Sequence, residues 1–252
     1  MMTKGELKEA LMVEQFPLSA KYDPQWMIRN DMGPNSVWLT EYLAKAMDFK
    51  PGMKILDMGC GKAMSSIFLA KEFGVQVWAN DLWITATDNW RRIKEAGVED
   101  LVFPIRAEAH ALPYAKEFFD AIISIDSYHY YGTNELYLFN FVELLKPNGQ
   151  IGIVVPGLMK EFEDEVPVKL KPYWDSEWYT YHSPNWWSKL WRRSGLVDIE
   201  VSDTMPNGWN LWLKWETTAK QSGFWGRNGD IELLTADGGE YFTFTRLVAR
   251  RR

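Results

Sequence analysis

The stretch KILDMGCGKAMSS, residues 54–66, decides how the chain folds. Its first five residues have the apolar pattern of a buried strand, GCG breaks that pattern, and helical spacing resumes after the break. Two glycines in three positions weaken any regular element, and their usual use is to let a ligand or another backbone come close. The stretch therefore predicts a strand, a tight turn beside a ligand, and a helix.

Strands and helices alternate on both sides of this turn. Glycines at 74 and 97 are placed to end helices at about 63–73 and 85–96, and a further helix is expected near 134–145. Short β-branched runs predict the strands, at 53–58, 75–81, 101–105, 121–126 and 150–155. We therefore expect an α/β fold: a Rossmann-like doubly wound sheet, mostly parallel, with helices on both faces. Ligands of such sheets bind outside the carboxyl ends of the strands.

Four segments are expected along the chain. Residues 1–50 predict an N-terminal helical cover, with a helix within 4–14 and another that Ser36 caps and that runs to Met47. Residues 51–155 form the Rossmann-like core, 156–230 an aromatic-rich cap and substrate region, and 231–252 a last, antiparallel strand at the sheet edge. The closing arginines, at 246 and 250–252, are interpreted as a frayed, solubilising end.

Tryptophan is the unusual part of the composition. The chain has 14 tryptophans, and eight lie between 174 and 215: Trp174, Trp178, Trp186, Trp187, Trp191, Trp209, Trp212 and Trp215. As core residues they would cover the sheet and brace an insertion. As site residues they would offer ring faces to a cationic or flat acceptor and exclude water. The sequence leaves both interpretations open.

Composition and charge limit the class of protein. A chain of 252 residues with 46% hydrophobic residues suits one large domain, or a domain with a cap, that buries a real core. A net charge of −6 argues against nucleic-acid binding, and no apolar run approaches the ~18 residues of a membrane span. The single cysteine, Cys60, fits a reducing compartment and is interpreted as a packing residue. We expect a cytoplasmic protein without a targeting segment or a metal.

A phosphate-binding loop is the first alternative for the glycine turn, because the open amides of a helix N-terminus suit a pyrophosphate. The fingerprint G-x-G-x-x-G fails here, since its third glycine position is Met64. Asp57, two residues before Gly59, would also repel a pyrophosphate, whereas it would attract a ligand with an ammonium group. The residues around the turn therefore favour a cationic ligand.

The turn resembles the first motif of the class I S-adenosylmethionine-dependent methyltransferases. That motif reads acidic-x-Gly-x-Gly-x-Gly after the first strand, and DMGCGKA at 57–63 matches it except for Ala63. The segment AEAHALPYAKEFFDAII at 107–123 resembles the family's G-D-A-x-x-L-P-x-x-x-x-F-D, and LLKPNGQI at 144–151 resembles its turn into the fifth strand. Within the family the chain looks most like the ubiquinone-biosynthesis and cyclopropane-synthase-like small-molecule methyltransferases.

This resemblance implies S-adenosyl-L-methionine as the cofactor and indicates its contacts. Asp81 lies 20 residues past Gly61 (81 − 61 = 20), where an acidic side chain would chelate the ribose hydroxyls, and Glu108 and Ala109 would lie at the adenine. The expected cofactor contacts are Asp57, Gly59, Cys60, Gly61, Asp81, Leu82, Glu108, Ala109 and Ile125, with Tyr22, Trp26 and Gly33 from the N-terminal cover.

The loop after the fourth strand, SIDSYHYYGTNE at 124–135, is expected to face the methyl group that is transferred. Methyl transfer mainly needs an aligned nucleophile and a dry site, and a base only where the acceptor must lose a proton. His129 is the expected base, with Asp126 and Tyr128 as substrate-positioning groups. A structural hydrogen bond is the alternative role for His129, and His182 in the cap is a second candidate base.

The expected activity is methyl transfer to a small-molecule acceptor, with an amine favoured by the aromatic cap and a hydroxyl next. Cyclopropane-synthase-like lipid modification is an alternative, although the run Tyr128-His129 lacks the glutamate of that group's Glu-His pair. An NAD(P)-dependent oxidoreductase of the same fold and a non-catalytic S-adenosylmethionine-binding protein are further alternatives. The sequence leaves the oligomeric state open.

Overall fold

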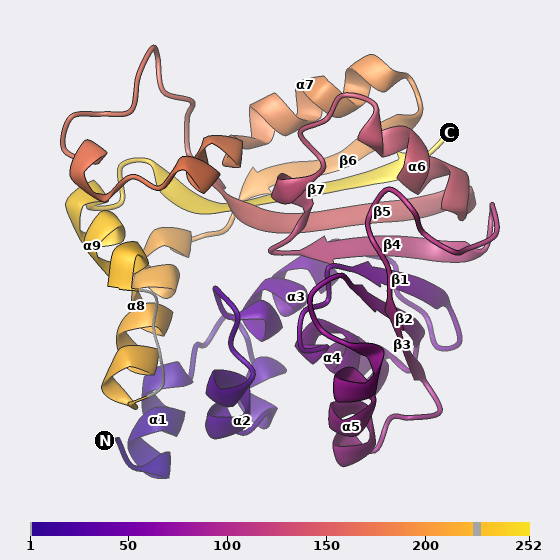
Figure 1. Ribbon diagram of the computed structural model, residues 1–252, viewed down its shortest axis with the longest axis horizontal. Coiled ribbons are helices and arrows are strands. Elements are labelled where there is room, and N and C mark those ends of the chain that lie inside the picture. The colour runs from indigo at the N-terminus through magenta and orange to yellow at the C-terminus, as the bar shows by residue number, and fades with distance from the viewer. Residues whose placement is uncertain (1, 224–227) are drawn as a thin grey trace.

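The sheet at the centre of the molecule has seven strands in the order β3-β2-β1-β4-β5-β7-β6 (Figure 1). The computed structural model describes residues 2–223 and 228–252. The strands are β1 (Lys54–Met58), β2 (Gln76–Asp81), β3 (Val102–Arg106), β4 (Phe119–Ile125), β5 (Leu145–Leu158), β6 (Val197–Thr204) and β7 (Phe242–Arg251). Strands β1 to β5 pair in parallel, and β7 is antiparallel to β5 and β6. The expected doubly wound sheet, mostly parallel with an antiparallel last strand, is confirmed.

The strand β1 is the point at which the strand order reverses. It pairs with β2 on one side and β4 on the other, so that Leu56 lies between Trp78 and Ile122. All of β1 after Lys54 is buried, because helices cover both faces of the sheet. A reversal of this kind opens a crevice at the carboxyl ends of the strands.

Helices cover both faces of the sheet (Figure 1). The helices α3 (Ser36–Ala44), α4 (Met64–Phe73) and α5 (Ala86–Ala96) lie on one face, and α6 (Tyr137–Leu144) and α7 (Pro184–Ser194) on the other. As predicted, α4 and α5 end at left-handed glycines, Gly74 and Gly97. The N-cap of α3 differs from the expectation: it is Asn35, whose Oδ1 accepts the N–H groups of residues 37 and 38, and Ser36 is the first helical residue.

Shorter elements surround this core. The N-terminal segment contains α1 (Lys4–Leu11), a 3₁₀ turn η1 (Ser19–Lys21) and α2 (Pro24–Arg29), and the later segment contains η3 (Lys171–Tyr173), η4 (Ser176–Thr180), α8 (Gly208–Gln221) and α9 (Asn228–Asp237). Although far apart in the sequence, α1 and α8 lie side by side (Figure 1). Within the described part of the chain, no helix has the length and apolar composition needed to cross a bilayer.

The order of the last two strands corrects one expectation. The last strand, β7, lies inside the sheet between β5 and β6, and the edge strand is β6. The sequence of β6, VDIEVSDT, alternates between partly buried and exposed positions and carries acidic residues, as exposed edge strands commonly do, and this polarity conceals it. Residues 184–204, within the expected cap at 156–230, therefore supply α7 and β6 to the core.

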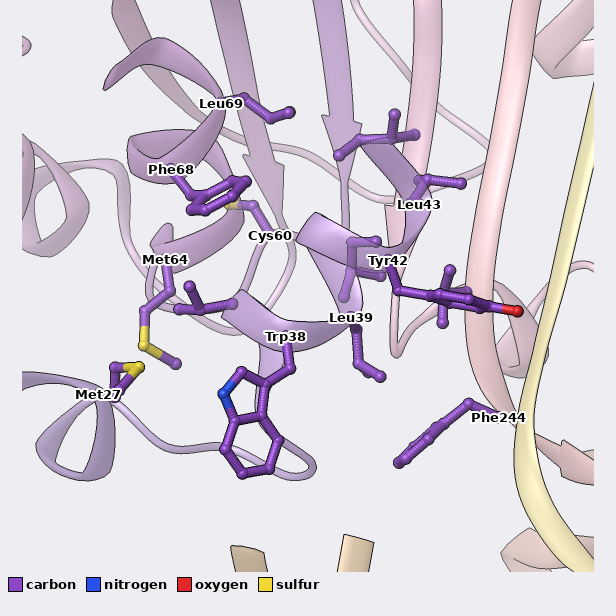
Figure 2. Close-up of a cluster of buried hydrophobic side chains, with 14 of the residues drawn as sticks. Met27, Trp38, Leu39, Tyr42, Leu43, Cys60, Met64, Phe68, Leu69 and Phe244 are labelled. Carbon is purple, nitrogen blue, oxygen red and sulfur yellow. The ribbon is translucent and has the colours of Figure 1, made fainter. Parts of the chain in front are cut away.

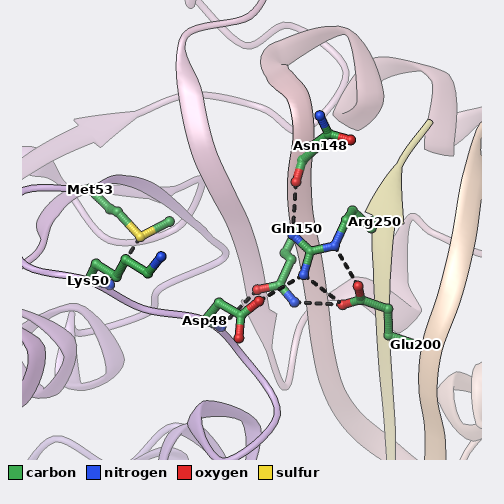
Figure 3. Close-up of polar contacts among 7 residues, drawn as sticks. All are labelled: Asp48, Lys50, Met53, Asn148, Gln150, Glu200 and Arg250. Carbon is green, nitrogen blue, oxygen red and sulfur yellow. Dashed lines mark hydrogen bonds and ion pairs between the residues drawn. The ribbon is translucent and has the colours of Figure 1, made fainter.

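The closing arginines hold β7 to its neighbours, so the expectation of a frayed end is wrong. Arg246 forms a two-pronged ion pair with Asp203 on β6, with N···O distances of 2.9 and 2.6 Å. Arg250 pairs with Glu200 on β6 and with Asp48 after α3 (Figure 3). The next two arginines also form ion pairs. These contacts join the two outer strands to the rest of the sheet.

Two hydrophobic clusters fill the two faces of the sheet. Figure 2 shows part of the larger one, where α3, which carries Trp38, packs against α4, which carries Met64 and Phe68. Burial of a side chain such as Phe68 stabilises the fold by about 1.5–3 kcal/mol. This packing fixes the start of α4, which carries the glycine turn.

Candidate active site

A cavity of about 300 Å³ opens at the carboxyl ends of β1, β2 and β4, where the strand order reverses. Its walls are the glycine turn with the start of α4, the ends of β2 and β4, the loop after β3, and a segment of the N-terminal cover, residues 30–36. We call this last segment the cover loop. The cavity lies where the sequence predicts a ligand.

The glycine turn forms one wall of the cavity. Both Gly59 (φ +74°) and Gly61 (φ +51°) have the left-handed backbone that favours glycine. A Cβ on Gly59 would lie 1.9 Å from Ser127 Oγ in the loop after β4, and a Cβ on Gly61 would lie 3.0 Å from Met32 Sδ in the cover loop. The two glycines therefore let two other segments of the chain approach and close the cavity.

Ala63 stands where the motif has its last glycine. Its φ of +62° is left-handed, and it is the N-cap of α4 without a side-chain hydrogen bond. A left-handed conformation costs an L-residue with a Cβ roughly 1–2 kcal/mol. Ala63 thus adopts at some cost a conformation that glycine adopts freely.

Asp81, at the end of β2, has its carboxylate fixed by three backbone N–H groups. Gly61 donates to Oδ2, and Trp83 and Ile84 donate to Oδ1, each at 2.8 Å. An ionised carboxylate offers about four acceptor sites, so after these three hydrogen bonds about one site remains for a hydroxyl group of a ligand. Asp81 lines the cavity, and its position between two strand ends follows from the parallel sheet.

Asp57 lies behind the cavity and does not line it. Its side chain is fully buried one residue before the end of β1, and Oδ2 accepts the hydroxyls of Ser65 at 2.5 Å and Ser66 at 2.6 Å. Burial raises the pKa of this carboxyl to about 6, against the lowering effect of the two hydroxyls, and nearby Asp81 raises it further. Among the described residues, Asp57 Oδ1 has no hydrogen-bond partner.

The loop after β3 contributes Glu108, Ala109 and His110 to the cavity wall. Glu108 accepts the backbone N–H of His110 at 2.7 Å and contacts its Nδ1 at 2.8 Å. The hydrogen bond from the His110 side chain is the main cause that lowers the pKa of Glu108. Both side chains are largely exposed, so this pair mainly orders the loop and adds little stability.

The loop after β4 brings a second carboxylate to the cavity. Asp126 has φ +52°, which is strained for a residue with a Cβ, and its N–H donates to Val154 O at 2.8 Å. A Cβ on Gly33 would lie 2.5 Å from Asp126 Oδ2, so the cover loop reaches this carboxylate only because residue 33 is glycine. Asp126 lines the cavity.

Aromatic side chains complete the wall. Trp83 and Tyr130, both largely exposed, line the cavity from the ends of β2 and β4, and their ring centroids lie 5.9 Å apart, edge to face. Tyr131 also lines it, and its hydroxyl lies 2.9 Å from Ser124 Oγ. These rings offer apolar faces and quadrupoles that attract cations.

The cover loop is held on both of its sides. Trp215, fully buried on α8, donates from Nε1 to Gly33 O at 2.9 Å and to Asp31 Oδ1 at 3.3 Å. From the other side, Lys62 Nζ donates to Asp31 O at 3.1 Å, and Met32 lies against Gly61. A tryptophan distant in the sequence therefore positions one wall of the cavity.

Most of the predicted site residues lie together. The cavity is lined by ten of them: Gly33, Gly59, Cys60, Gly61, Asp81, Leu82, Glu108, Ala109, Ile125 and Asp126. The thiol of Cys60 is buried and its pKa is raised by that burial, in agreement with a packing role. The residues are therefore brought together as the sequence predicts, and their roles toward a ligand stay predictions.

Four predicted residues lie away from the cavity, besides Asp57. Tyr22 donates its hydroxyl to Glu72, and Trp26 lines a separate groove. Tyr128 is fully buried in the hydrophobic cluster under α6 and α7, and the buried ring of His129 packs between Tyr130 and Tyr181. The expectation that Tyr128 and His129 face the substrate is therefore corrected: neither side chain lines the cavity.

The tryptophans at 174–215 also lie elsewhere. None of these eight, all within the described residues, lines the cavity. Five are buried: Trp178, Trp187, Trp191, Trp212 and Trp215. His182, the second candidate base, stacks on Trp186 and contacts Glu161 at 3.0 Å, and it does not line the cavity either. The core interpretation of the cluster is therefore correct.

Comparison with known proteins agrees with this geometry. A family model described as a methyltransferase domain matches residues 55–149, which hold the glycine turn, Asp81 and the ends of β3 and β4. This match, the methyltransferases among the relatives and the structural neighbours together support a class I S-adenosylmethionine-dependent methyltransferase. The cofactor of this family is S-adenosylmethionine.

Curated relatives of this chain are named for methyl transfer to different atoms. The chain is 31% identical over 116 residues to methyltransferase GfsG of Streptomyces halstedii, and 27% identical over 190 residues to erythromycin 3''-O-methyltransferase of Saccharopolyspora erythraea. It is 26% identical over 178 residues to glycine/sarcosine/dimethylglycine N-methyltransferase of Actinopolyspora halophila. These alignments cover 46%, 69% and 69% of this chain and only 42%, 60% and 31% of the respective relatives.

Solved structures share the fold of this chain. Phosphoethanolamine N-methyltransferase 2 of Haemonchus contortus, solved with S-adenosyl-L-methionine, has a TM-score of 0.71 at 18% identity, covering 99% of this chain and 60% of that one. The [4+2]-cyclase SpnF has a TM-score of 0.68 at 16% identity, covering 88% and 83%. Because one of these is named a cyclase, the fold alone does not fix the reaction.

Proposed function

We propose that the protein transfers the methyl group of S-adenosylmethionine to a small-molecule acceptor bound in this cavity, an amine in preference to a hydroxyl. The observation that carries the proposal is the charge of the cavity wall. Three carboxylates line it, Asp81, Glu108 and Asp126, and Asp57 lies directly behind. The basic side chains among the lining residues are Lys62 and His110, and His110 is paired with Glu108. Excess negative charge in a half-buried site favours a cationic ligand over a diphosphate.

The residues present suit the cofactor. Asp81 retains about one acceptor site for a ribose hydroxyl, and Leu82, Glu108 and Ala109 would hold the adenine beside it. The opposite end of the cavity, at the starts of α4 and of the loop after β4, would then receive the amino-acid portion and the reacting centre. When bound, the cofactor supplies a methyl group already activated by a positive sulfur.

The acceptor is assigned from the groups at that end. Asp126 would hold the ammonium form of an amine by charge and accept the proton that must leave before the nitrogen can react. Trp83 and Tyr130 offer ring faces that stabilise cations and exclude water. A hydroxyl acceptor is next, because an aliphatic hydroxyl is a weaker acid than an ammonium group and gives up its proton to a carboxylate less readily. The N-methyltransferases among the relatives support the first acceptor, and the erythromycin O-methyltransferase supports the second.

Product analysis tests this function. The protein is incubated with S-adenosylmethionine and separate panels of amines, phenols, carboxylic acids and unsaturated phospholipids, and S-adenosylhomocysteine release and product mass are measured. Turnover on an amine supports the proposal, whereas a product from the lipid panel alone would favour lipid modification. Binding of S-adenosylmethionine without release in any panel would favour the non-catalytic binding protein. A thermal shift with NADH or NADPH but none with S-adenosylmethionine would favour the oxidoreductase.

A further inference from the structure

Two exposed aromatic rings meet at the mouth of the cavity. Trp83, two residues after Asp81 at the end of β2, is 64% exposed, the highest value for a tryptophan in the described part of the chain. Tyr130, in the loop after β4, is 42% exposed, and both side chains line the cavity. Single exposed apolar side chains are ordinary, whereas apolar rings that adjoin a cavity indicate a surface for a ligand. We call these two rings the aromatic rim.

The aromatic rim crosses the sheet. The strand order places β1 between β2 and β4, so these two strands lie about 10 Å apart. The ring centroids of Trp83 and Tyr130 lie only 5.9 Å apart, edge to face. The two rings therefore lean toward each other across the carboxyl end of β1, where the glycine turn begins.

A carboxylate lies close in the chain to each ring of the rim. The backbone N–H of Trp83 donates to Asp81 Oδ1 at 2.8 Å, and the N–H of Tyr130 donates to Ser127 O at 3.0 Å, in the turn that begins directly after Asp126. Both aspartates line the cavity. The site thus combines negative charge inside with an apolar surface at its mouth. A ligand complementary to both has a cationic end and an apolar end.

The size of the cavity limits how much of a second ligand it can hold. Its volume of about 300 Å³ is at the low end of the range for a pocket that takes one drug-sized ligand. Once S-adenosylmethionine occupies it, room remains for the reacting group of an acceptor but not for a large body. The body must then lie at the mouth, where the aromatic rim supplies exposed apolar surface.

We propose that the acceptor is an amphipathic amine, whose ammonium group enters the cavity and whose apolar body lies on the aromatic rim. Trp83 and Tyr130 are then the residues that determine specificity for the acceptor. This inference rests on the proposed function, which it narrows from amines in general to amines with an alkyl chain or an aryl group. Small polar amines leave the rim uncovered and are poorer acceptors.

The test measures how affinity depends on the length of the apolar body. Primary alkylamines from ethylamine to hexylamine are titrated calorimetrically into the protein saturated with S-adenosylhomocysteine, and the same amines are assayed for turnover with S-adenosylmethionine. Each added methylene should tighten binding about two- to fourfold, the upper value corresponding to complete burial. Trp83→Ala and Tyr130→Ala should each lower this gain, and the double variant should leave less than about 1.5-fold per methylene. Trp83→Leu, which restores apolar surface without a ring, should recover part of the gain.

Trp90 is the matched control. It is an exposed tryptophan on α5 and does not line the cavity. Trp90→Ala therefore removes an exposed ring without altering the rim, and it should keep the full gain per methylene. Because all three rings are exposed, the variants should fold, and thermal melts check this.

The outcomes separate this inference from the proposed function. Equal affinity of the unaltered protein for ethylamine and hexylamine would overturn the inference, while turnover of these amines would still support the proposed function. A gain per methylene that survives in the double variant, or that falls equally in Trp90→Ala, would also overturn it. Graded binding that depends on the rim, with no turnover of any amine, would support the rim as the binding surface and reject methyl transfer to amines. Failure to bind any of the amines would reject both.

Discussion

The contact between Trp215 and the cover loop gives the sharpest prediction. Trp215→Phe keeps an aromatic ring in the buried site but removes the N–H that donates to Gly33 O at 2.9 Å and to Asp31. The freed carbonyl of Gly33 loses a buried donor, at a cost of about 1–3 kcal/mol in the free energy of unfolding. For a chain of this length each kcal/mol lowers Tm by roughly 2–4 °C.

Trp212 is the matched control on the same helix. It is buried like Trp215, and its Nε1 has no hydrogen-bond partner within the described residues. Trp212→Phe loses the same volume and no hydrogen bond, so the difference between the two variants isolates the contact with the cover loop. We expect Trp215→Phe to have the lower Tm by roughly 2–12 °C.

Ligand binding separates a local effect from a global one. Because the cover loop is a wall of the cavity, Trp215→Phe should also weaken S-adenosylhomocysteine binding several-fold, whereas Trp212→Phe should not. Calorimetric unfolding and titration of both variants check this. Equal Tm values and equal affinities for the two variants would refute the view that α8 positions the cavity wall.

Three further predictions concern the cavity itself. Gly59→Ala places a Cβ within 2.4 Å of two Ser127 atoms, so it should destabilise the fold measurably in a thermal melt, and Ser127→Gly should restore part of the loss. The carboxyl of Asp57, with its pKa at about 6, is neutral below that pH and ionised above it. The affinity for cationic S-adenosylmethionine, relative to that for S-adenosylhomocysteine with its uncharged sulfur, should therefore rise from pH 5 to pH 7. Titrations of Asp57→Asn should show a flatter pH profile. Asp126→Asn should lower amine turnover by about 10²–10⁴-fold while S-adenosylhomocysteine binding persists, and retained turnover would remove Asp126 as the base.

The fold was accessible from the sequence wherever local chemistry decides it. Left-handed glycines after α4 and α5 and the apolar runs of β1 to β5 fix those elements without reference to the rest of the chain. The position of β7 was not accessible, because alternation predicts a strand but not which neighbours it pairs with. Its inner place depends on β6, an edge strand whose acidic residues weaken the strand signal in its sequence.

Only part of the candidate site was predicted, because the local sequence decides only part of it. Residues at strand ends, such as Asp81 and Asp126, are brought together by the parallel sheet alone. The loop after β4 contains a tight 3₁₀ turn, η2 (Tyr128–Tyr130), in which successive side chains point in different directions. Asp126 and Tyr130 therefore line the cavity while the residues between them at 128 and 129 are buried. A sequence run does not show which members of such a turn face a ligand.

The central place of β7 has a consequence for synthesis on the ribosome. Until residues 242–251 emerge, β5 has one unpaired edge and β6 has no partner strand at all. Exposed strand edges are templates for association with other chains. A nascent or truncated chain that stops short of Phe242 should therefore aggregate rather than fold with a slightly smaller sheet, and a recombinant chain shortened at this point should accumulate in inclusion bodies.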